Sequence, residues 1–127
     1  MTKHRILVVD DEKGFTAMLK LNLESTGSYD VRIENDSIHA LTSAVQYSPD
    51  LILLDVIMPN LEGPDVAFQV RQHPNLKNTP IVFLTATVTK EEIDLQGGNI
   101  GGHPFVAKPS TLASLLESIE RNIVMAA

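Results

Sequence analysis

Five short runs of valine, isoleucine, leucine and phenylalanine recur along the chain, separated by longer segments in which apolar residues repeat every three or four positions. Such runs are typical of buried strands. They predict strands at about 5–10, 29–34, 51–55, 80–85 and 104–107. Because strands and helical segments alternate, the pattern indicates βαβ units and a mostly parallel sheet, which is an α/β fold.

Four of the segments outside these runs carry an apolar stripe with helical spacing. The stripes comprise Phe15, Met18, Leu19 and Leu23; Ile38, Leu41, Ala44 and Val45; Val66, Ala67 and Val70; and Leu112, Leu115, Leu116, Ile119 and Ile123. We expect the first helix to stop at Gly27 and the third to begin near Gly63-Pro64, since proline is tolerated at the first helical position. Ser110 or Thr111 can serve as the N-cap of the last helix.

The segment before the last strand gives the weakest helical signal. Residues 90–96 could form two turns, but glycine pairs follow at 97–98 and 101–102. Glycine costs ~1 kcal/mol relative to alanine in a helix interior. We therefore expect a short or frayed fourth helix.

Chemically active side chains stand where the predicted strands end. Asp10 and Asp11 follow the first run, Asp55 ends the third, Thr85 ends the fourth and Lys108 follows the last. In an open parallel sheet, ligands bind outside the carboxyl ends of the strands, so these residues can share one pocket. Taken singly, each has a plain structural explanation as a turn or helix N-cap, a strand former or a solvated loop residue. Their joint order at four strand ends favours the functional interpretation.

Three converging carboxylates would repel one another and favour a bound cation. Two carboxylates ~4 Å apart repel by about 4 kcal/mol at an effective dielectric of 20. All the donor atoms would be oxygen, which favours Mg²⁺, an ion that keeps several waters and completes its shell with phosphate. Calcium is less favoured, because the chain lacks the D-x-[DN]-x-[DN]-G loop. Asp55 could also act as a nucleophile toward phosphorus, with Lys108 and Thr85 stabilising the transferred group.

Composition narrows the class of protein. The 127 residues suit one domain, 1–127, and the formal net charge of -6 disfavours direct contact with nucleic acid. The sequence has no cysteine, which excludes disulfides, thiolate zinc sites and cysteine nucleophiles. No apolar run approaches the ~20 residues that span a bilayer, and Met1–Arg5 lacks the apolar core of a signal peptide. We expect a soluble cytoplasmic protein without a membrane partner.

The chain resembles the receiver domain of two-component response regulators over essentially its whole length. The matching motifs are Val8-Val9-Asp10-Asp11-Glu12, Leu54-Asp55-Val56-Ile57-Met58-Pro59 with Gly63, Leu84-Thr85-Ala86, and Phe105-Val106-Ala107-Lys108-Pro109. The D-x-x-M-P-x-x-x-G string makes the resemblance specific when it is combined with the acid pair and the K-P pair. It implies a doubly wound (βα)5 fold, with a five-stranded parallel sheet in the order 2-1-3-4-5 flanked by five helices.

This resemblance implies a phosphorylation-dependent signalling switch of a two-component system, and not an enzyme that acts on a separate substrate. Asp55 would be the phosphoacceptor, supplied by a histidine kinase or a phosphotransfer protein. Mg²⁺ would be the cofactor, bound by Asp11 and Asp55, by Asp10 through water and by the backbone carbonyl of Ile57.

The same resemblance assigns roles at the last two strands. Thr85 would hydrogen-bond the phosphoryl group, Ala86 would leave space beside it and Lys108 would pair with it. The Lys108-Pro109 bond would be cis. Phe105 would be the switch aromatic, turning inward when Thr85 moves toward the phosphoryl group; its plain alternative is a core residue.

Two features of the sequence depart from the pattern of this family. Ile57 and Thr87 flank the path by which water would attack the acyl phosphate, and Ile57 offers no hydrogen bond to that water, so we expect slow self-dephosphorylation. The glycine-rich residues 97–102 stand where the family has a helix end and one glycine turn. They fall within 90–125, the family's usual output face for a downstream effector.

Two rival functions remain for an α/β sheet of this kind. An aspartyl phosphatase normally has a second Asp two residues after the nucleophile, and Ile57 occupies that position. A phosphate-independent interaction module would retain the receiver fold without its chemistry. The presence of Asp55, Asp11 and Lys108 disfavours this alternative without eliminating it, and homodimerisation stays open.

Overall fold

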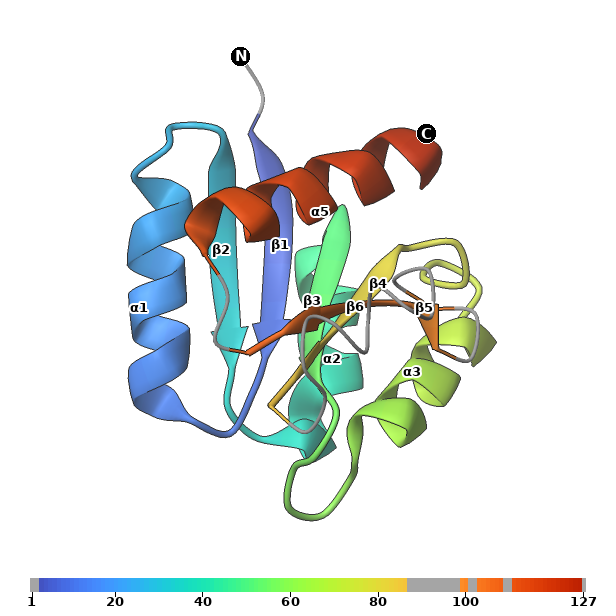
Figure 1. Ribbon diagram of the computed structural model, residues 1–127. Helices are drawn as coiled ribbons and strands as arrows, with labels where there is room; N and C mark the ends of the chain where they lie inside the picture. The colour runs from blue at the N-terminus through green and yellow to red at the C-terminus, as the bar shows by residue number, and fades with distance from the viewer. Residues whose placement is uncertain (1–2, 87–98, 101–102, 109–110, 127) are drawn as a thin grey trace.

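A central sheet is covered by helices on both faces (Figure 1). The computed structural model describes residues 3–86, 99–100, 103–108 and 111–126. Its elements are β1 (His4–Val9), α1 (Lys13–Glu24), β2 (Tyr29–Glu34), a 3-10 turn (Ser37–His39), α2 (Ala40–Tyr47), β3 (Leu51–Asp55), α3 (Gly63–Gln72), β4 (Ile81–Thr85), β5 (Asn99–Ile100), β6 (His103–Ala107) and α5 (Leu112–Ala126).

Five parallel strands run in the order β2-β1-β3-β4-β6, which confirms the predicted 2-1-3-4-5 arrangement. The two-residue strand β5 adds to this sheet and pairs antiparallel with β6. The sequence did not predict β5, because two residues inside a glycine-rich segment carry no readable alternation. Four of the five predicted helices lie in the described part of the chain, and the fourth, at 90–96, lies outside it.

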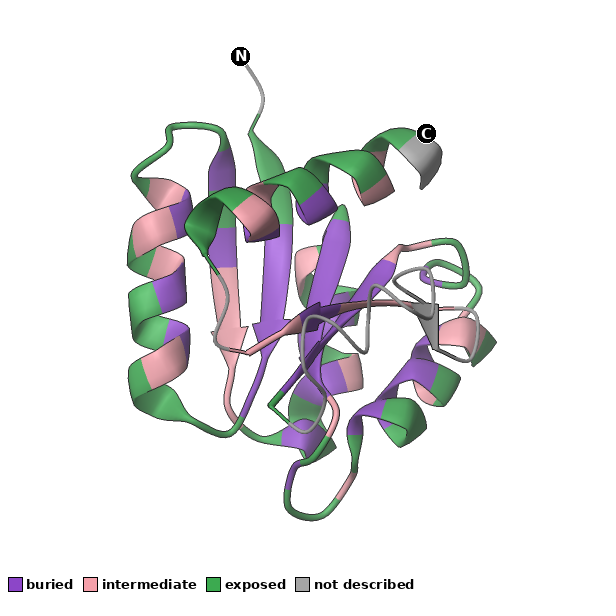
Figure 2. Cartoon of the chain, in the orientation of Figure 1, coloured by how far each residue is buried: buried purple, intermediate pink, exposed green. Residues whose placement is uncertain are grey.

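Alternate residues of the central strands face opposite layers of helices and so build two cores. Ile6 and Val8 belong to the core under α1 and α5, whereas Leu7 and Val9 belong to the core under α2 and α3. Figure 2 shows buried residues concentrated in β1, β3 and β4. Because both faces of these strands are covered, their sequences are continuous apolar runs.

The predicted helical stripes are confirmed only in part. Four members of these stripes, Met18, Ile38, Val45 and Leu112, are 51%, 53%, 42% and 38% exposed, so they do not belong to the buried core. Thr16 of α1 and Ser43 of α2 are buried, at 1% and 4% exposure. Both hydroxyls are hydrogen-bonded within the protein, which allows them to be buried. A count of apolar periodicity misses such residues because it scores them as polar.

The predicted helix ends agree with the structure. Gly27 has a φ of +80°, a left-handed conformation suited to glycine, just after α1 ends. The helix α3 begins at Gly63 and carries a proline in its first turn. Thr111 Oγ1 accepts a hydrogen bond from the Ser114 N–H at 3.1 Å, as an N-cap of α5 would. The alternative cap, Ser110, lies outside the described residues.

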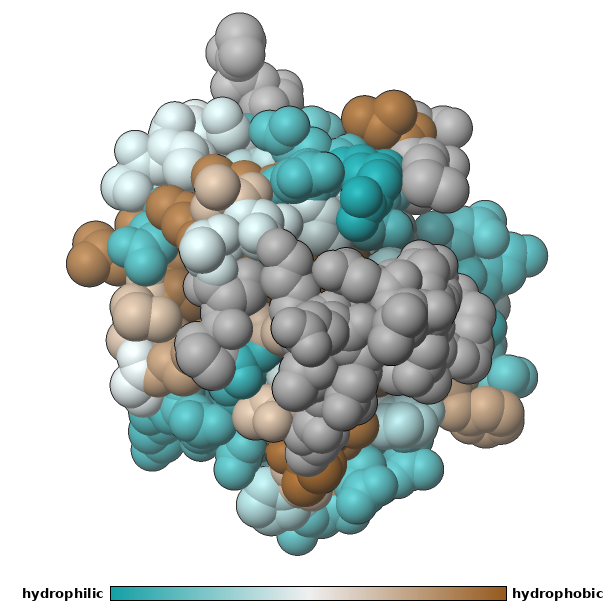
Figure 3. Space-filling model, viewed as in Figure 1, coloured by the Kyte–Doolittle hydropathy of each residue, from teal (hydrophilic) through white to brown (hydrophobic). Residues whose placement is uncertain are grey.

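Exposed apolar side chains are scattered over the molecule. Leu21, Phe68 and Val124 are 70%, 66% and 72% exposed and lie on three different helices. Figure 3 shows apolar patches separated by hydrophilic surface on the face that it presents. Within the described residues, no helix combines the length and the apolar content that crossing a membrane requires.

Candidate functional site

Three carboxylates meet at the carboxyl ends of β1 and β3. Asp10 and Asp11 directly follow β1, and Asp55 is the last residue of β3. One oxygen atom of each carboxylate lies within 4.8 Å of the others. Asp10 and Asp55 are only 0% and 7% exposed, whereas Asp11 is exposed. The predicted convergence of the acids is therefore confirmed, and Asp11 forms the solvent side of the cluster.

Hydrogen bonds from the surrounding backbone and loop hold Asp10. Its N–H donates to the Glu34 carbonyl at 3.1 Å, and its Oδ1 accepts from the Glu12 N–H at 2.9 Å. Asn35 Nδ2 donates to the Asp10 carbonyl at 2.8 Å. The N-cap residue of α1 is Glu12, and no side chain caps that helix. The alternative that Asp10 or Asp11 serves as its N-cap is therefore wrong.

The turn after Asp55 is pinned between β4 and α3. The Val56 N–H donates to the Leu84 carbonyl at 3.1 Å, and the Gly63 N–H donates to the Val56 carbonyl at 2.8 Å. A Cβ atom on Gly63 would overlap the Asp55 carbonyl oxygen and lie 2.9 Å from Val56 Cα. Residue 63 must therefore be glycine for α3 to start this close to the end of β3.

Lys108 brings an ammonium group into the acid cluster from the end of β6. Its Nζ lies 2.7 Å from Asp10 Oδ2, 2.8 Å from Glu12 Oε1 and 3.9 Å from Asp55 Oδ2. The same nitrogen lies 4.4 Å from the centroid of the Phe15 ring. The Lys108 backbone N–H donates to the Thr85 carbonyl at 2.8 Å, which ties the loop after β6 to the end of β4. The lysine side chain is only 9% exposed.

The other predicted site residues surround this cluster. Thr85 ends β4 and is 2% exposed, and Ala86 is exposed beside it. Ile57 is 56% exposed, two residues after Asp55. Phe105 is partly buried and packs on Phe83, with ring centroids 5.0 Å apart. Thr87, Pro109 with the predicted cis bond, and most of the glycine-rich segment 97–102 lie outside the described residues.

Burial and neighbouring charges shift the pKa values of Asp55 and Lys108. Burial raises the pKa of Asp55 to about 6, and the negative charge of Asp10 acts in the same direction, against the opposing charge of Lys108. Burial alone would lower the pKa of Lys108, but hydrogen bonds to Asp10 and Glu12 outweigh it and hold that pKa above its ordinary value. At pH 7, Asp55 is mostly ionised and Lys108 is charged.

The raised pKa of Asp55 predicts that Asp55→Asn stabilises the protein at neutral pH without metal. The folded protein binds this proton more tightly than the unfolded chain, so the carboxyl lowers stability as pH rises from about 4 to about 6, and the loss persists above. We expect the variant to gain about 1–3 kcal/mol at pH 7 and little at pH 3.5. Urea unfolding of both proteins in EDTA measures the difference, and equal stabilities at pH 7 would contradict it.

Some residues that shape the site received no role from the sequence. Glu12 stands in the quoted Asp-Asp-Glu motif, but nothing in the motif shows that its side chain reaches Lys108. Ser37 supports the loop after Asp55, since its Oγ donates to the Pro59 carbonyl at 2.8 Å and accepts from the Leu61 N–H at 3.1 Å. The sequence carries no signal for such contacts, because they join segments more than 20 residues apart and are seen only in the folded structure.

Comparison with known proteins places this geometry in a family. A family model of the response regulator receiver domain matches residues 6–120. The chain belongs to this family. The receiver domain is 42% identical over 106 residues to the alkaline phosphatase synthesis transcriptional regulatory protein PhoP of Bacillus subtilis, a match that covers 83% of the chain and 42% of that protein. It spans about half the length of the curated relatives it matches.

Solved receiver structures share the fold of this receiver domain. Chemotaxis protein CheY4 of Vibrio cholerae is 30% identical, with a TM-score of 0.81, and the match covers 95% of this chain and 99% of that one. The receiver domain of sensor histidine kinase PA1611 from Pseudomonas aeruginosa PAO1 is also 30% identical, with a TM-score of 0.81 and coverage of 97% and 99%. That structure has a magnesium ion coordinated in its active site cleft.

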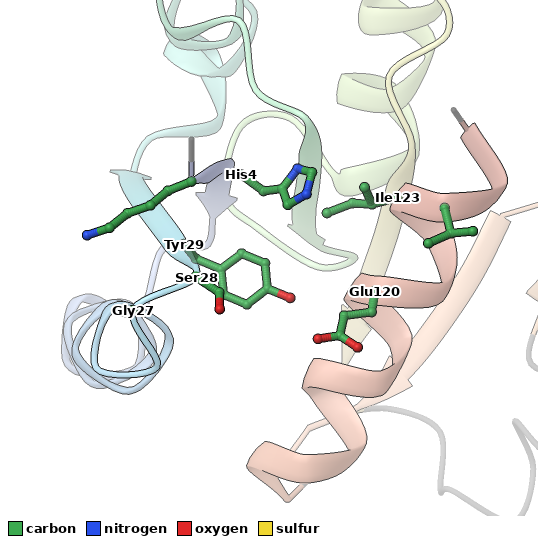
Figure 4. Close-up of a pocket in the computed structure, with 8 residues that line it drawn as sticks. His4, Gly27, Ser28, Tyr29, Glu120 and Ile123 are labelled. Atoms are coloured by element: carbon green, nitrogen blue, oxygen red, sulfur yellow. The ribbon is translucent and has the colours of Figure 1, made fainter. Parts of the chain in front are cut away.

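The receiver domain also has a cavity at the amino-terminal ends of β1 and β2, away from the strand ends that carry the acid cluster. This cavity has a volume of about 330 Å³ and is lined by His4, Tyr29, Glu120 and Ile123, among others (Figure 4). These residues come from the starts of β1 and β2 and from α5. Because none of them lies at a carboxyl end of a strand, the cavity is separate from the acid cluster.

Proposed function

We propose that this receiver domain is a phosphorylation switch that accepts a phosphoryl group on Asp55. The observation that carries the proposal is the placement of the Lys108 ammonium 3.9 Å from Asp55 Oδ2, beside three carboxylates whose oxygens lie within 4.8 Å. This arrangement combines a nucleophilic oxygen with a cation for the incoming charge. The donor would be a phosphohistidine of a histidine kinase or a phosphotransfer protein.

In the proposed transfer, an Asp55 carboxylate oxygen attacks phosphorus. The new P–O bond gives an acyl phosphate, the P–N bond to the donor imidazole breaks, and the nitrogen keeps that electron pair and takes up a proton. With a pKa of about 6, Asp55 is mostly in the anionic form that attack requires at pH 7. Its burial at 7% exposure limits solvation of the nucleophile.

Lys108 and Thr85 are placed to stabilise the transferred group. Lys108 would pair with phosphoryl oxygens, because its ammonium already lies 3.9 Å from Asp55 Oδ2. Thr85 ends the neighbouring strand β4, which pairs with β3 so that Asp55 stands opposite Leu84. Its hydroxyl would hydrogen-bond the phosphoryl group.

The donor set fits Mg²⁺. Asp10, Asp11 and Asp55 offer only oxygen atoms, and three carboxylates with one lysine leave a net negative charge for a hard cation. These side chains and the Ile57 backbone carbonyl would hold the ion. When bound, Mg²⁺ would neutralise part of the charge on the phosphoryl oxygens.

The response to phosphate would be transmitted through Phe105. This ring packs on Phe83 of β4, the strand that Thr85 ends, so a shift of Thr85 would change the packing of both rings. Because Phe105 has no hydroxyl, burying it leaves no polar group unsatisfied. The surface of residues 90–125 would then present the change to a downstream effector.

The proposed function predicts that the protein gains one phosphoryl group when incubated with Mg²⁺ and acetyl phosphate. Intact mass spectrometry measures the gain, and peptide mapping after borohydride reduction of the acyl phosphate locates it. We expect the modification on Asp55 and little uptake in EDTA. If no phosphoryl group is gained, a phosphate-independent interaction module becomes the better description.

The exposed side chain of Ile57 predicts a long-lived acyl phosphate. An isoleucine here cannot orient an attacking water, so Ile57→Asn should shorten the lifetime by about 2- to 10-fold, the worth of one net hydrogen bond. The decay of the phosphorylated protein after removal of acetyl phosphate measures it. Ile57→Val, which stays apolar, should decay as the parent does; a longer or unchanged lifetime in Ile57→Asn would refute the explanation.

A further inference from the structure

The Lys108 ammonium is held by two carboxylates, and neither is Asp55. Its Nζ makes hydrogen bonds to Asp10 at 2.7 Å and to Glu12 at 2.8 Å, whereas its distance of 3.9 Å from Asp55 is too long for one. The Phe15 ring covers a further side of the nitrogen at 4.4 Å. Lys108 therefore rests in a pocket of its own beside the phosphoacceptor.

An ammonium group has three N–H donors; two are taken by Asp10 and Glu12, and the Phe15 ring lies 4.4 Å from the nitrogen and restricts access to the third. Because Asp55 Oδ2 is 3.9 Å away, the ammonium would have to move toward Asp55 to bind a phosphoryl group there, and this movement would lengthen its contact with one of its two carboxylate partners. The partners differ in what release costs: Asp10 is 0% exposed, whereas the Glu12 side chain is 62% exposed. A buried carboxylate that loses its cation is left without solvent, but an exposed one is hydrated at once.

The backbone around Glu12 supports this asymmetry. Its N–H donates to Asp10 Oδ1 at 2.9 Å, and its carbonyl accepts from the Thr16 N–H at 3.0 Å. These bonds fix the backbone of the residue at the N-terminus of α1. The carboxylate alone is free to leave Lys108 without disturbing the helix.

We propose that Glu12 is a positioning residue that holds Lys108 away from Asp55 until a phosphoryl group displaces it. The proposal rests on the proposed phosphorylation of Asp55 and adds a competitor for the lysine. Lys108 keeps Asp10 throughout and exchanges Glu12 for the phosphoryl oxygens. Glu12 therefore opposes phosphoryl uptake, and its carboxylate at the start of α1 becomes solvated in the phosphorylated protein.

Removing the charge of Glu12 should speed uptake without changing decay. In Glu12→Gln the amide binds Lys108 less strongly, so the transfer no longer has to break an ion pair. Because Glu12 is exposed, its ion pair with Lys108 is expected to be worth as little as a surface pair, which corresponds to a rate increase of about two- to fivefold. Hydrolysis begins after the exchange has occurred, so the acyl-phosphate lifetime should equal that of the parent.

The test compares rates of phosphoryl uptake from acetyl phosphate at saturating Mg²⁺. Glu62→Gln is the matched control, since Glu62 is an exposed N-cap residue of α3 next to Gly63 and is not among the described partners of Lys108. We expect faster uptake in Glu12→Gln only. Equal rates in the parent and Glu12→Gln, or equal acceleration in both variants, overturn the proposal. A parent that takes up no phosphoryl group instead overturns the proposed function.

A second measurement reports the exchange itself. The carboxyl ¹³C resonance of Glu12 should move toward that of solvated Glu62 when Asp55 is phosphorylated. If the Glu12 resonance stays unchanged while the mass shows complete phosphorylation, the proposed exchange of Glu12 for phosphoryl oxygens is wrong. A loss of folding in Glu12→Gln does not interfere, because this measurement uses the parent protein.

Discussion

Asp55→Asn is expected to abolish phosphoryl uptake from acetyl phosphate while the fold stays intact. The amide nitrogen and oxygen carry no negative charge, so the variant lacks the nucleophile that forms the acyl phosphate. The side chain keeps its size in a site that is 7% exposed. Lys108 retains its hydrogen bonds to Asp10 and Glu12, which do not involve Asp55. Intact mass after incubation with Mg²⁺ measures the loss.

Asp30→Asn provides the control for this experiment. Asp30 is an exposed aspartate of β2 that pairs with Lys3 at 4.0 Å, so this variant removes one negative charge outside the acid cluster. This variant should gain one phosphoryl group at the parent's rate. A full gain in Asp55→Asn would show that another residue is the acceptor and would contradict the assignment.

Gly63→Ala is expected to destabilise the protein by about 3 kcal/mol, at the upper end of typical overpacking effects. The added Cβ would overlap the Asp55 carbonyl oxygen and press on Val56 Cα at 2.9 Å. Both obstacles are backbone atoms, so no side chain can rotate away. Relief requires α3 to move from β3, which stretches the hydrogen bond from the Gly63 N–H to the Val56 carbonyl. Urea unfolding at pH 7 in EDTA measures the change.

Gly14→Ala is the matched control, because it adds the same methyl group in another helix. A Cβ on Gly14 in α1 would meet no atom within 4 Å. Alanine is favoured over glycine in helices, so this variant should be more stable by up to about 1 kcal/mol. If Gly63→Ala were as stable as the parent, the contact between α3 and the end of β3 would not constrain this position.

Most of the sheet could be predicted because its strands are buried on both faces. Runs such as Ile6 to Val9 contain apolar residues only, so they are recognised without assigning a face to each position. The bounds of the predicted strands agree with the structure within one residue. The helical stripes were harder, since Met18 and Ile38 are apolar but exposed. Hydropathy alone cannot predict that such apolar residues are exposed while Thr16 is buried, with its hydroxyl bonded to Lys13 in the same helix and to Asn35 after β2.

The acid cluster was predictable because parallel strands bring their carboxyl ends to one edge. Asp10 and Asp55 follow from strand ends alone. What could not be predicted is the partner of each group. A lysine near several acids can bind any of them, and the pairing of Lys108 with Asp10 and Glu12 depends on burial and reach, which the order of residues does not encode.

The short antiparallel strand β5 bears on how copies of this chain can associate. It occupies the outer edge of β6, and a two-residue strand offers a neighbouring chain few hydrogen bonds. At the other edge, β2 carries the charged residues Asp30, Arg32 and Glu34 at alternate positions. Both borders of the sheet thus resist strand addition, so self-association would proceed through helix surfaces and not through a continuous intermolecular sheet.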